Sequence, residues 1–202
     1  MSSLKFMLAK DYIQGKHDVI GWYMSEKFDG YRACYCPKDK RFYSRQNKPF
    51  NVPEWFLQAM PPRLMDGELW IGRNRFQDMG AVRKKIPLDE EWLNITFQVY
   101  DMPEHPGTFS ERIKELSTLV KLAQSKWNRK RKEFDYPFNK LECPLVLAKQ
   151  IPLTSLKHLD KVYKEVLQQE GEGVMLKDPN SPYEGKRSSL LLKYKPNFDE
   201  EA

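Results

Sequence analysis

Short apolar runs separated by turn residues dominate the first half of the chain, and this pattern predicts strands there. Residues 53–60 fit a short helix, because Pro53 is compatible with a first helical turn. Asp29 and Gly30 lie between the first two apolar runs, and such a pair is typical of a tight turn between two strands. We expect strands over residues 22–27, 31–36, 41–45, 64–71 and 95–100.

The second half of the chain predicts two longer helices. Thr108 and Glu111 have the spacing of a capping box, and apolar residues follow them at helical intervals. Residues 155–169 carry the apolar face of the second helix. Between the helices, residues 126–143 are polar and basic, so we expect an irregular loop there. Further strands are expected near residues 173–177 and 190–195.

Many strands with few interspersed helices predict an α+β protein with antiparallel sheets. The 202 residues, 40% of them apolar, suffice for one structural domain, with the last few residues as a trailing end. No apolar run is long enough to span a membrane. The N-terminus lacks the apolar core of a signal peptide, which favours an intracellular protein and leaves export of a processed precursor open.

Charge and cysteine content exclude few classes of protein. The chain has 34 Lys and Arg against 28 Asp and Glu, a net charge of +6. A moderate positive charge fits a polyanionic partner, but it is also common among ordinary globular proteins. The odd number of cysteines, three, and the absence of a CxxC pair argue against a disulfide framework or a zinc site.

Lys27 is the first candidate for chemistry. It stands at the end of a predicted strand, beside Asp29 and Gly30, with Arg32 shortly after. A lysine attacks as a nucleophile only in its neutral form, which burial or nearby cations favour. The alternative is a surface lysine beside a hairpin, and this stretch alone leaves both interpretations open.

Four further stretches carry charged residues next to predicted strands. Arg45 follows one strand, Glu68 interrupts another, and Glu172 precedes a third. Lys193 and Lys195 share one strand face, where they repel each other unless an anion lies between them. Each stretch has a plain alternative, namely a strand bulge, a helix C-cap or a solvated strand face. Together they fit a site for a nucleoside triphosphate and one divalent metal, since carboxylates suit magnesium.

These stretches, taken in order, resemble the nucleotidyltransferase motifs of ATP-dependent DNA ligases. The resemblance extends from residue 7 to residue 196 and is most evident to the minimal ligases of bacteria, some viruses and mitochondria. It implies the nucleotidyltransferase fold shared by DNA ligases and mRNA-capping enzymes, with antiparallel sheets flanked by helices and a nucleotide pocket between the sheets. The matching segments are SEKFDGYR, YSRQNK, MDGELW, FQVYDMP, EGVMLK and LLKYKP.

The resemblance assigns the nucleophile to Lys27, which would take AMP from ATP as a lysyl-adenylate. Phe97 would stack on the adenine, and Glu68 would hold the ribose hydroxyls. Glu172 would hold magnesium, for which manganese is a possible substitute, and Asp29 would organise the turn. The residues placed against ATP or AMP are Ser25, Glu26, Lys27, Arg32, Arg45, Glu68, Phe97, Met175, Arg187, Lys193 and Lys195.

The resemblance also implies a monomeric enzyme that acts on nicked duplex DNA without membrane contact, in replication, repair or recombination. AMP would pass to the 5′-phosphate at the nick, and the adjacent 3′-hydroxyl would then displace it. The candidates for contact with DNA phosphates are Arg45, Lys130 and Arg131. The last two belong to a basic cluster at residues 126–132, which a solvated loop would also explain.

The sequence departs from the family pattern at its end. Ligases of this family continue from the fifth motif into an OB-fold domain, and this sequence stops directly after that motif. We therefore expect residues 1–202 to be an adenylation domain of a longer enzyme, with a stand-alone form as the alternative. RNA ligases and mRNA-capping guanylyltransferases share the lysine motif and are rival interpretations. A non-catalytic nucleic-acid-binding module is the third, although every charged residue expected of the site is present.

Overall fold

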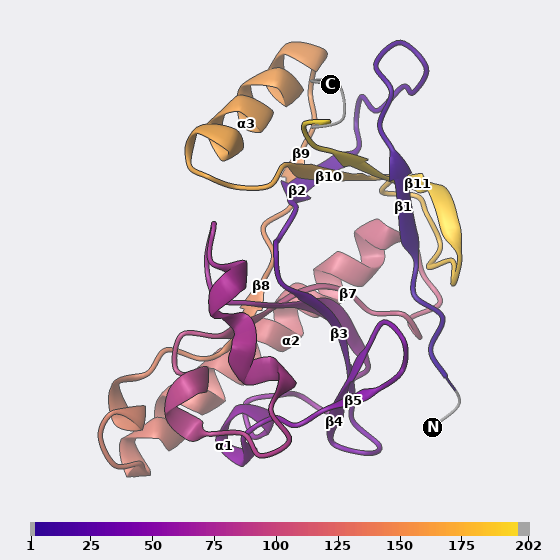
Figure 1. Ribbon diagram of the computed structural model, residues 1–202. Coiled ribbons are helices and arrows are strands. Elements are labelled where there is room, and N and C mark those ends of the chain that lie inside the picture. Colours follow the sequence, from indigo (N-terminus) through magenta and orange to yellow (C-terminus); the bar gives the residue numbers. More distant parts are fainter. Residues whose placement is uncertain (1–2, 198–202) are drawn as a thin grey trace.

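Two mixed β-sheets dominate the computed structural model, which describes residues 3–197 (Figure 1). The first sheet has the order β1 (Leu8–Asp11), β11 (Arg187–Tyr194), β10 (Val174–Lys177), β2 (Tyr23–Glu26) and β9 (Ile151–Pro152). The second has the order β5 (Pro49–Phe50), β4 (Arg41–Ser44), β3 (Tyr31–Cys36), β6 (Met65–Trp70), β7 (Thr96–Asp101) and β8 (Leu145–Leu147). The α+β class is therefore confirmed. The expected trailing end falls largely outside the described residues.

The sheets are mostly antiparallel, as expected, but each contains one parallel pair of strands. β1 runs parallel to β11 in the first sheet, and β7 runs parallel to β8 in the second. Strands β1, β5, β8 and β9 have at most four residues, too short for a clear apolar alternation in the sequence. The remaining expected strands are present, and β11 starts three residues earlier than expected.

Asp29 and Gly30 do not form a hairpin turn. β2 and β3 flank them but pair in different sheets, so the chain crosses here from one sheet to the other. A Cβ atom on Gly30 would lie 2.0 Å from the carbonyl oxygen of Leu69, so only glycine allows this close backbone approach. Asp29 accepts a hydrogen bond from Trp70 Nε1 at 3.0 Å, a contact that fits the expected structural role.

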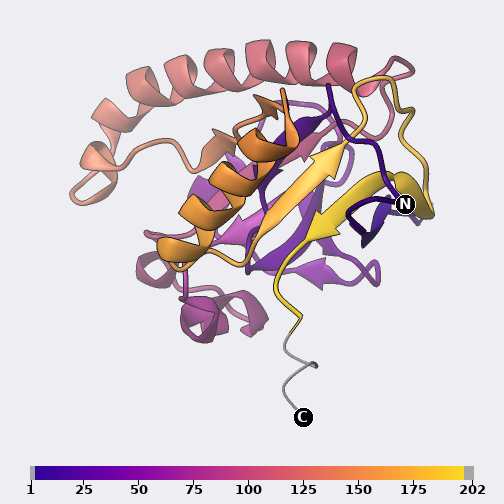
Figure 2. The ribbon, with the colours of Figure 1, turned by 90° about the horizontal axis from the view of Figure 1, so that it is seen from above.

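The first long helix, α2 (Phe109–Lys130), extends well into the segment expected to be a loop. The capping box of Thr108 and Glu111 is present as predicted. The helix continues because Trp127 lies on its buried face and donates from Nε1 to the carbonyl oxygen of Leu141 at 2.8 Å. Short 3₁₀ turns follow at Arg131–Glu133 and Phe138–Lys140. Figure 2 shows α2 running along one side of the molecule.

Each sheet has its own apolar core. The larger core lies between the six-stranded sheet and α2, and it includes the short helix α1 (Glu54–Leu57) and the 3₁₀ segments Phe76–Arg83 and Asp89–Trp92. The smaller core lies between the five-stranded sheet and α3 (Leu156–Gln168). Within residues 3–197, no helix is both long and apolar enough to cross a membrane. The three cysteines are buried free thiols, as the sequence suggested.

Candidate active site

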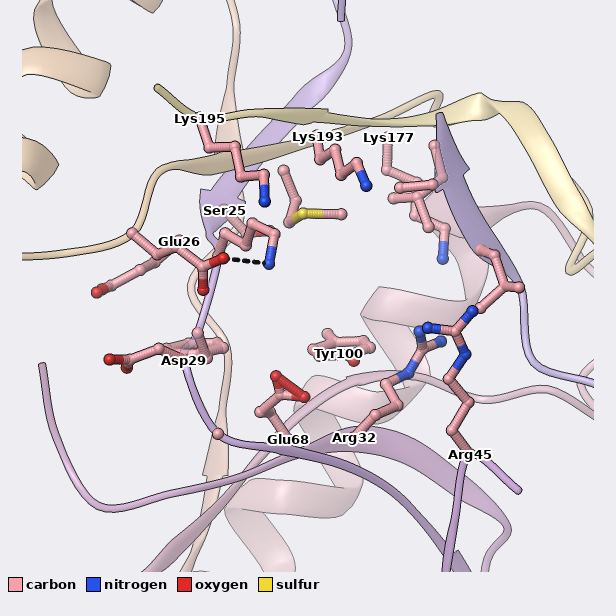
Figure 3. A pocket seen from close by; sticks show the side chains of 18 of the residues that line it. Ser25, Glu26, Asp29, Arg32, Arg45, Glu68, Tyr100, Lys177, Lys193 and Lys195 are labelled. Carbon is pink, nitrogen blue, oxygen red and sulfur yellow. Dashed lines mark hydrogen bonds and ion pairs between the residues drawn. The ribbon is translucent and has the colours of Figure 1, made fainter. Parts of the chain in front are cut away.

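A cavity of about 580 Å³ lies between the two sheets, and both sheets contribute to its lining (Figure 3). Ligand pockets in proteins commonly have volumes of roughly 300–1,000 Å³, so a nucleotide fits here. Segments far apart in the sequence meet in its walls. The expected site residues that line it are Ser25, Glu26, Lys27, Arg32, Arg45, Glu68, Glu172, Met175, Arg187, Lys193 and Lys195.

Lys27 occupies the point where the chain leaves β2 for the second sheet. Its backbone N–H donates to the carbonyl oxygen of Gly173 at 2.9 Å, which fixes the strand end beside the loop before β10. Its Nζ donates to Glu172 Oε1 at 2.7 Å, and the two side chains are 23% and 30% exposed. Gly173 has a φ of +156°, and a Cβ there would lie 2.3 Å from the carbonyl oxygen of Tyr194. Only glycine therefore lets Glu172 and Lys27 meet in this way.

Strand register brings two more lysines to the same wall. Met175 pairs with Ser25 of β2 on one side and with Lys193 of β11 on the other, so these residues form one row across the sheet. Lys195 lies just beyond β11 and also lines the cavity. Leu192, on the opposite strand face, is fully buried in the smaller core. The alternation of the strand thus presents both lysines to the cavity, as the sequence predicted.

Glu68 faces the lysines from the six-stranded sheet (Figure 3). Its carboxylate has no hydrogen-bond partner among residues 3–197. Burial raises the pKa of Glu68 to about 8, even though Arg32 and Lys27 lie near enough to oppose the shift. A half-buried carboxylate without a protein partner is available to hydroxyl groups of a ligand.

The Arg32 side chain lines the cavity, and hydrogen bonds to neighbouring residues fix its guanidinium. Its Nε and Nη2 donate to the two carboxylate oxygens of Asp66 at 2.7 and 2.6 Å, and Nη2 also donates to the carbonyl oxygen of Met7 at 3.0 Å. Tyr183 donates to the same carboxylate at 2.7 Å. Asp66, whose role the sequence left open, therefore fixes the guanidinium. The Nη1 donors of Arg32 are left for an anion, since a guanidinium has five N–H donors.

Phe97 is not at the cavity, so its expected contact with a base is wrong. Its side chain is fully buried in the larger core, where it packs edge-on against Phe42 at 4.9 Å between ring centroids. Tyr100, three residues further along β7, faces the cavity instead (Figure 3). Residues three apart on a strand point to opposite faces, so an aromatic platform here is Tyr100, across the cavity from Met175. The sequence contained a signal for this assignment, because strand alternation places Phe97 and Val99 on one face and Tyr100 on the other.

Lys177 is a cavity residue that the sequence interpretation missed. It follows Met175 by two positions on β10 and ion-pairs with the buried carboxylate of Asp101. Arg112 of α2 also donates to Asp101, from Nε at 2.7 Å. Burial alone would raise the pKa of Asp101, but the two cations outweigh burial and hold this pKa below its usual range. Burial lowers the pKa of Lys177, and Asp101 opposes that effect.

The donor set fits a nucleotide with a metal bound mainly by its phosphates. Seven cationic side chains line the cavity together with Glu172: Lys27, Arg32, Arg45, Lys177, Arg187, Lys193 and Lys195. No group of three or more metal-ligating side chains occurs among residues 3–197. Magnesium commonly uses one or two carboxylates and takes its other ligands from water and phosphate, so Glu172 alone is an adequate protein ligand.

Two expected DNA contacts lie far from the cavity. Lys130 is the last residue of α2 and Arg131 is its C-cap, whereas Phe109 at the other end lines the cavity. A helix of 22 residues spans about 33 Å. Arg131 donates to the carbonyl oxygen of Leu141 at 2.8 Å and pairs loosely with Glu142. Its guanidinium therefore has a structural role that the sequence interpretation did not foresee.

The two sheets and the cavity between them have the nucleotidyltransferase fold of DNA ligases and mRNA-capping enzymes. A solved structure from a structure-function study of Lig E DNA ligases matches with a TM-score of 0.77 and 28% identity, over 95% of this chain and 68% of that chain. The Chlorella virus DNA ligase-adenylate matches with a TM-score of 0.74 and 19% identity, over 95% of this chain and 68% of that chain, which supports the fold alone.

The chain belongs to the family of ATP-dependent DNA ligase domains, whose model matches residues 7–195. A DNA ligase of Haemophilus influenzae is 33% identical over 183 residues, which are 91% of this chain and 61% of that ligase. An mRNA-capping enzyme of African swine fever virus is 22% identical over 98% of this chain and 20% of that enzyme. The chain thus spans about three fifths of the Haemophilus ligase and a smaller part of the viral enzyme.

Proposed function

We propose that this chain is the adenylation domain of an ATP-dependent DNA ligase and that Lys27 becomes covalently charged with AMP. The observation that carries the proposal is the contact between Lys27 Nζ and Glu172 Oε1, at 2.7 Å, inside a nucleotide-sized cavity lined by further cations. A lone surface lysine would not be expected to have such surroundings.

In the proposed reaction, Lys27 Nζ forms a bond to the α-phosphorus of ATP. The bond from this phosphorus to the bridging oxygen breaks, and pyrophosphate leaves with the electron pair. Lys27 must lose one proton before it attacks, and Glu172 Oε1 is the acceptor placed to take it. The attacking nitrogen loses a second proton to solvent as the N–P bond forms, which leaves a neutral phosphoramidate nitrogen. Magnesium bound to Glu172 and the phosphates would neutralise phosphate charge, and manganese has similar ligand preferences.

The other lining residues would bind and orient the nucleotide. The purine would lie between Tyr100 and Met175, and the ribose hydroxyls would donate to the unpartnered carboxylate of Glu68. Lys193 and Lys195 would stabilise the charge that develops on the α-phosphate, because their strand holds them on the cavity wall before reaction. Positioning and electrostatics account for most catalysis in phosphoryl transfer, and the same terms apply here.

The other charged lining residues are proposed to have separate roles. The free Nη1 donors of Arg32, together with Arg187, would contact nucleotide phosphate or ribose oxygens. Ser25 would lie at the purine edge, in the strand row that contains Met175. Arg45 would meet the 5′-phosphate of a nick, because it combines exposure with a place in the cavity lining.

The acceptor is proposed to be the 5′-phosphate at a nick in duplex DNA, after which the 3′-hydroxyl displaces AMP and closes the backbone. This substrate class is proposed on the ligase family and the Haemophilus relative. The roles in replication, repair and recombination, and action as a monomer, are proposed on the motif resemblance alone. The proposal that residues 1–202 form one adenylation domain, joined in the full enzyme by an OB-fold domain, also rests on the family. Lys130 and Arg131 remain candidates for duplex contact remote from the nick.

A guanylyltransferase of the capping type is the second candidate, because the viral capping enzymes match nearly the whole chain. Donor choice separates the two functions. Intact mass spectrometry after incubation with ATP or GTP and magnesium is therefore the test. The proposal predicts a gain of one AMP from ATP, its loss on adding pyrophosphate, and no gain in Lys27→Ala. A gain of GMP alone would establish the capping reaction, and no nucleotide gain from either donor would contradict both.

A nicked RNA substrate compared with a nicked DNA substrate separates a DNA ligase from an RNA ligase. A non-catalytic binding module predicts no nucleotide gain and DNA binding that Lys27→Ala leaves unchanged. The proposal predicts that charged protein transfers its AMP to the nicked DNA.

A further inference from the structure

Arg73 joins three segments of the chain from outside the nucleotide cavity. It follows Gly72, shortly after the end of β6, and so belongs to the six-stranded side of the molecule. Its Nε and Nη2 donate to the two carboxylate oxygens of Glu26 at 2.8 and 3.0 Å. Its Nη1 donates to the side-chain oxygen of Gln169. One guanidinium therefore holds a residue of β2 and the C-cap of α3 together.

Both partners of Arg73 stand next to the reacting groups. Glu26 directly precedes Lys27 on β2, and Gln169 lies three residues before Glu172. Between them, Gly171 packs so closely on Glu26 that an added Cβ would lie 3.2 Å from Oε1. The Arg73 contacts thus fix the two chain segments that carry Lys27 and Glu172, whose side chains meet at 2.7 Å in the cavity.

Arg73 does not line the nucleotide cavity. It lines a neighbouring cavity of about 430 Å³, whose lining shares Ser25, Glu26 and Phe28 with the nucleotide cavity. The side-chain partners of Arg73 are Glu26 and Gln169, so these two residues connect it to the nucleotide cavity. Glu26, which the sequence analysis placed against the nucleotide, has its carboxylate bound by Arg73 instead.

The size of the expected effects separates positioning from simple stabilisation. The side chains of Arg73 and Glu26 are 31% and 18% exposed, so the pair is only partly withdrawn from water. Ion pairs that are partly exposed to water commonly contribute little to stability. By contrast, misplacing a reacting group by about 1 Å can lower a rate by roughly 100-fold. The Arg73 contacts are therefore expected to contribute little to the stability of the fold and much to the alignment of Lys27 with Glu172.

We propose that Arg73 is a positioning residue, which aligns Lys27 with Glu172 by binding Glu26 and Gln169 at once. The inference rests on the proposed charging of Lys27 with AMP. A lysine at position 73 offers a point charge and not a planar fork, so it cannot make all of these contacts. We therefore expect Arg73→Gln to slow AMP transfer to Lys27 by about 10- to 100-fold, and Arg73→Lys to have an intermediate effect.

The matched control is Arg75→Gln. Arg75 lies two residues further along the same segment and pairs with Asp78 at 3.0 Å, and it lines neither cavity. Three quantities are measured for each variant: the single-turnover rate of AMP incorporation, the affinity for a non-hydrolysable ATP analogue, and the melting temperature. The inference predicts that only the rate falls in the Arg73 variants and that Arg75→Gln behaves like the wild type.

A double-mutant cycle with Glu26→Gln adds a test that a general structural role would not pass. If Arg73 acts through Glu26, the double variant is little slower than Arg73→Gln alone. Equal rates for Arg73→Gln and wild type would overturn the inference while leaving the proposed function intact. A parallel fall in rate, analogue affinity and melting temperature would also overturn it, because Arg73 would then only support the fold. A wild-type chain that gains no AMP would overturn the proposed function, and this inference with it.

Discussion

Replacing Glu68 by glutamine should stabilise the protein while impairing its proposed activity. Glu68 lies in the cavity wall without a hydrogen-bond partner among residues 3–197, and its pKa is raised from 4.5 to about 8 by burial. Glutamine has nearly the same shape and no charge. The substitution therefore removes the cost of a half-buried carboxylate and leaves the packing in place.

The size and the pH dependence of this effect follow from the pKa of Glu68. Between pH 4.5 and about 8 the unfolded chain loses this proton while the folded protein keeps it, so the wild type loses stability as pH rises through this range. The full shift corresponds to at most about 5 kcal/mol. Water reaches the cavity side of the carboxylate, so we expect about 2 kcal/mol at pH 8.5 and almost no difference at pH 4.5.

Urea denaturation of wild type and Glu68→Gln at several pH values is the assay, with Glu133→Gln as an exposed control. The advantage of Glu68→Gln should grow with pH, and the control should show no trend. AMP incorporation by Glu68→Gln, measured at pH 8.5 where the wild-type carboxyl group is largely ionised, should fall because the ribose loses a charged acceptor. A stability difference that does not vary with pH, or a less stable Glu68→Gln, would refute the reasoning.

Three further substitutions test other parts of the structure. Asp101→Asn should cost about 3–5 kcal/mol in denaturation experiments, because it leaves Lys177 and Arg112 buried without an anion. In the wild type, the low pKa of Asp101 means that its contribution is present at neutral pH and is lost as pH falls below the usual range of an aspartate. Tyr100→Ala should weaken binding of an ATP analogue by about 1–3 kcal/mol in calorimetry, with Tyr100→Phe close to wild type. Phe97→Ala should instead lose about 3–5 kcal/mol of stability, because it empties space in the larger core. If Phe97→Ala has normal stability but fails to bind the analogue, Phe97 contacts the nucleotide and its assignment to the core is wrong.

Local patterns predicted most elements, and long-range pairing could not be predicted from them. The capping box at Thr108 and the apolar faces of both helices located α2 and α3. The same local reasoning failed at Asp29 and Gly30, because a tight turn and a crossing between two sheets have the same short-range signal. It also failed at residues 126–130, where one buried side chain, Trp127, keeps a basic segment helical.

Most residues that line the cavity were located through the resemblance of their motifs to those of DNA ligases, because each single stretch had a plain alternative. Lys27, Glu68 and Lys193 are polar residues next to apolar strands, and the fold brings all three to one cavity. The roles of Asp66 and Lys177 depend on partners far along the chain, so no local pattern could reveal them.

The measurement that tests the central claim most directly is peptide mapping by tandem mass spectrometry after incubation with ATP and magnesium. The cavity contains four lysines, Lys27, Lys177, Lys193 and Lys195, so the position of the label distinguishes between them. The account predicts AMP on the peptide that contains Lys27, attached to its side chain, and on no other lysine of the cavity. AMP attached to Lys177, Lys193 or Lys195 would contradict it.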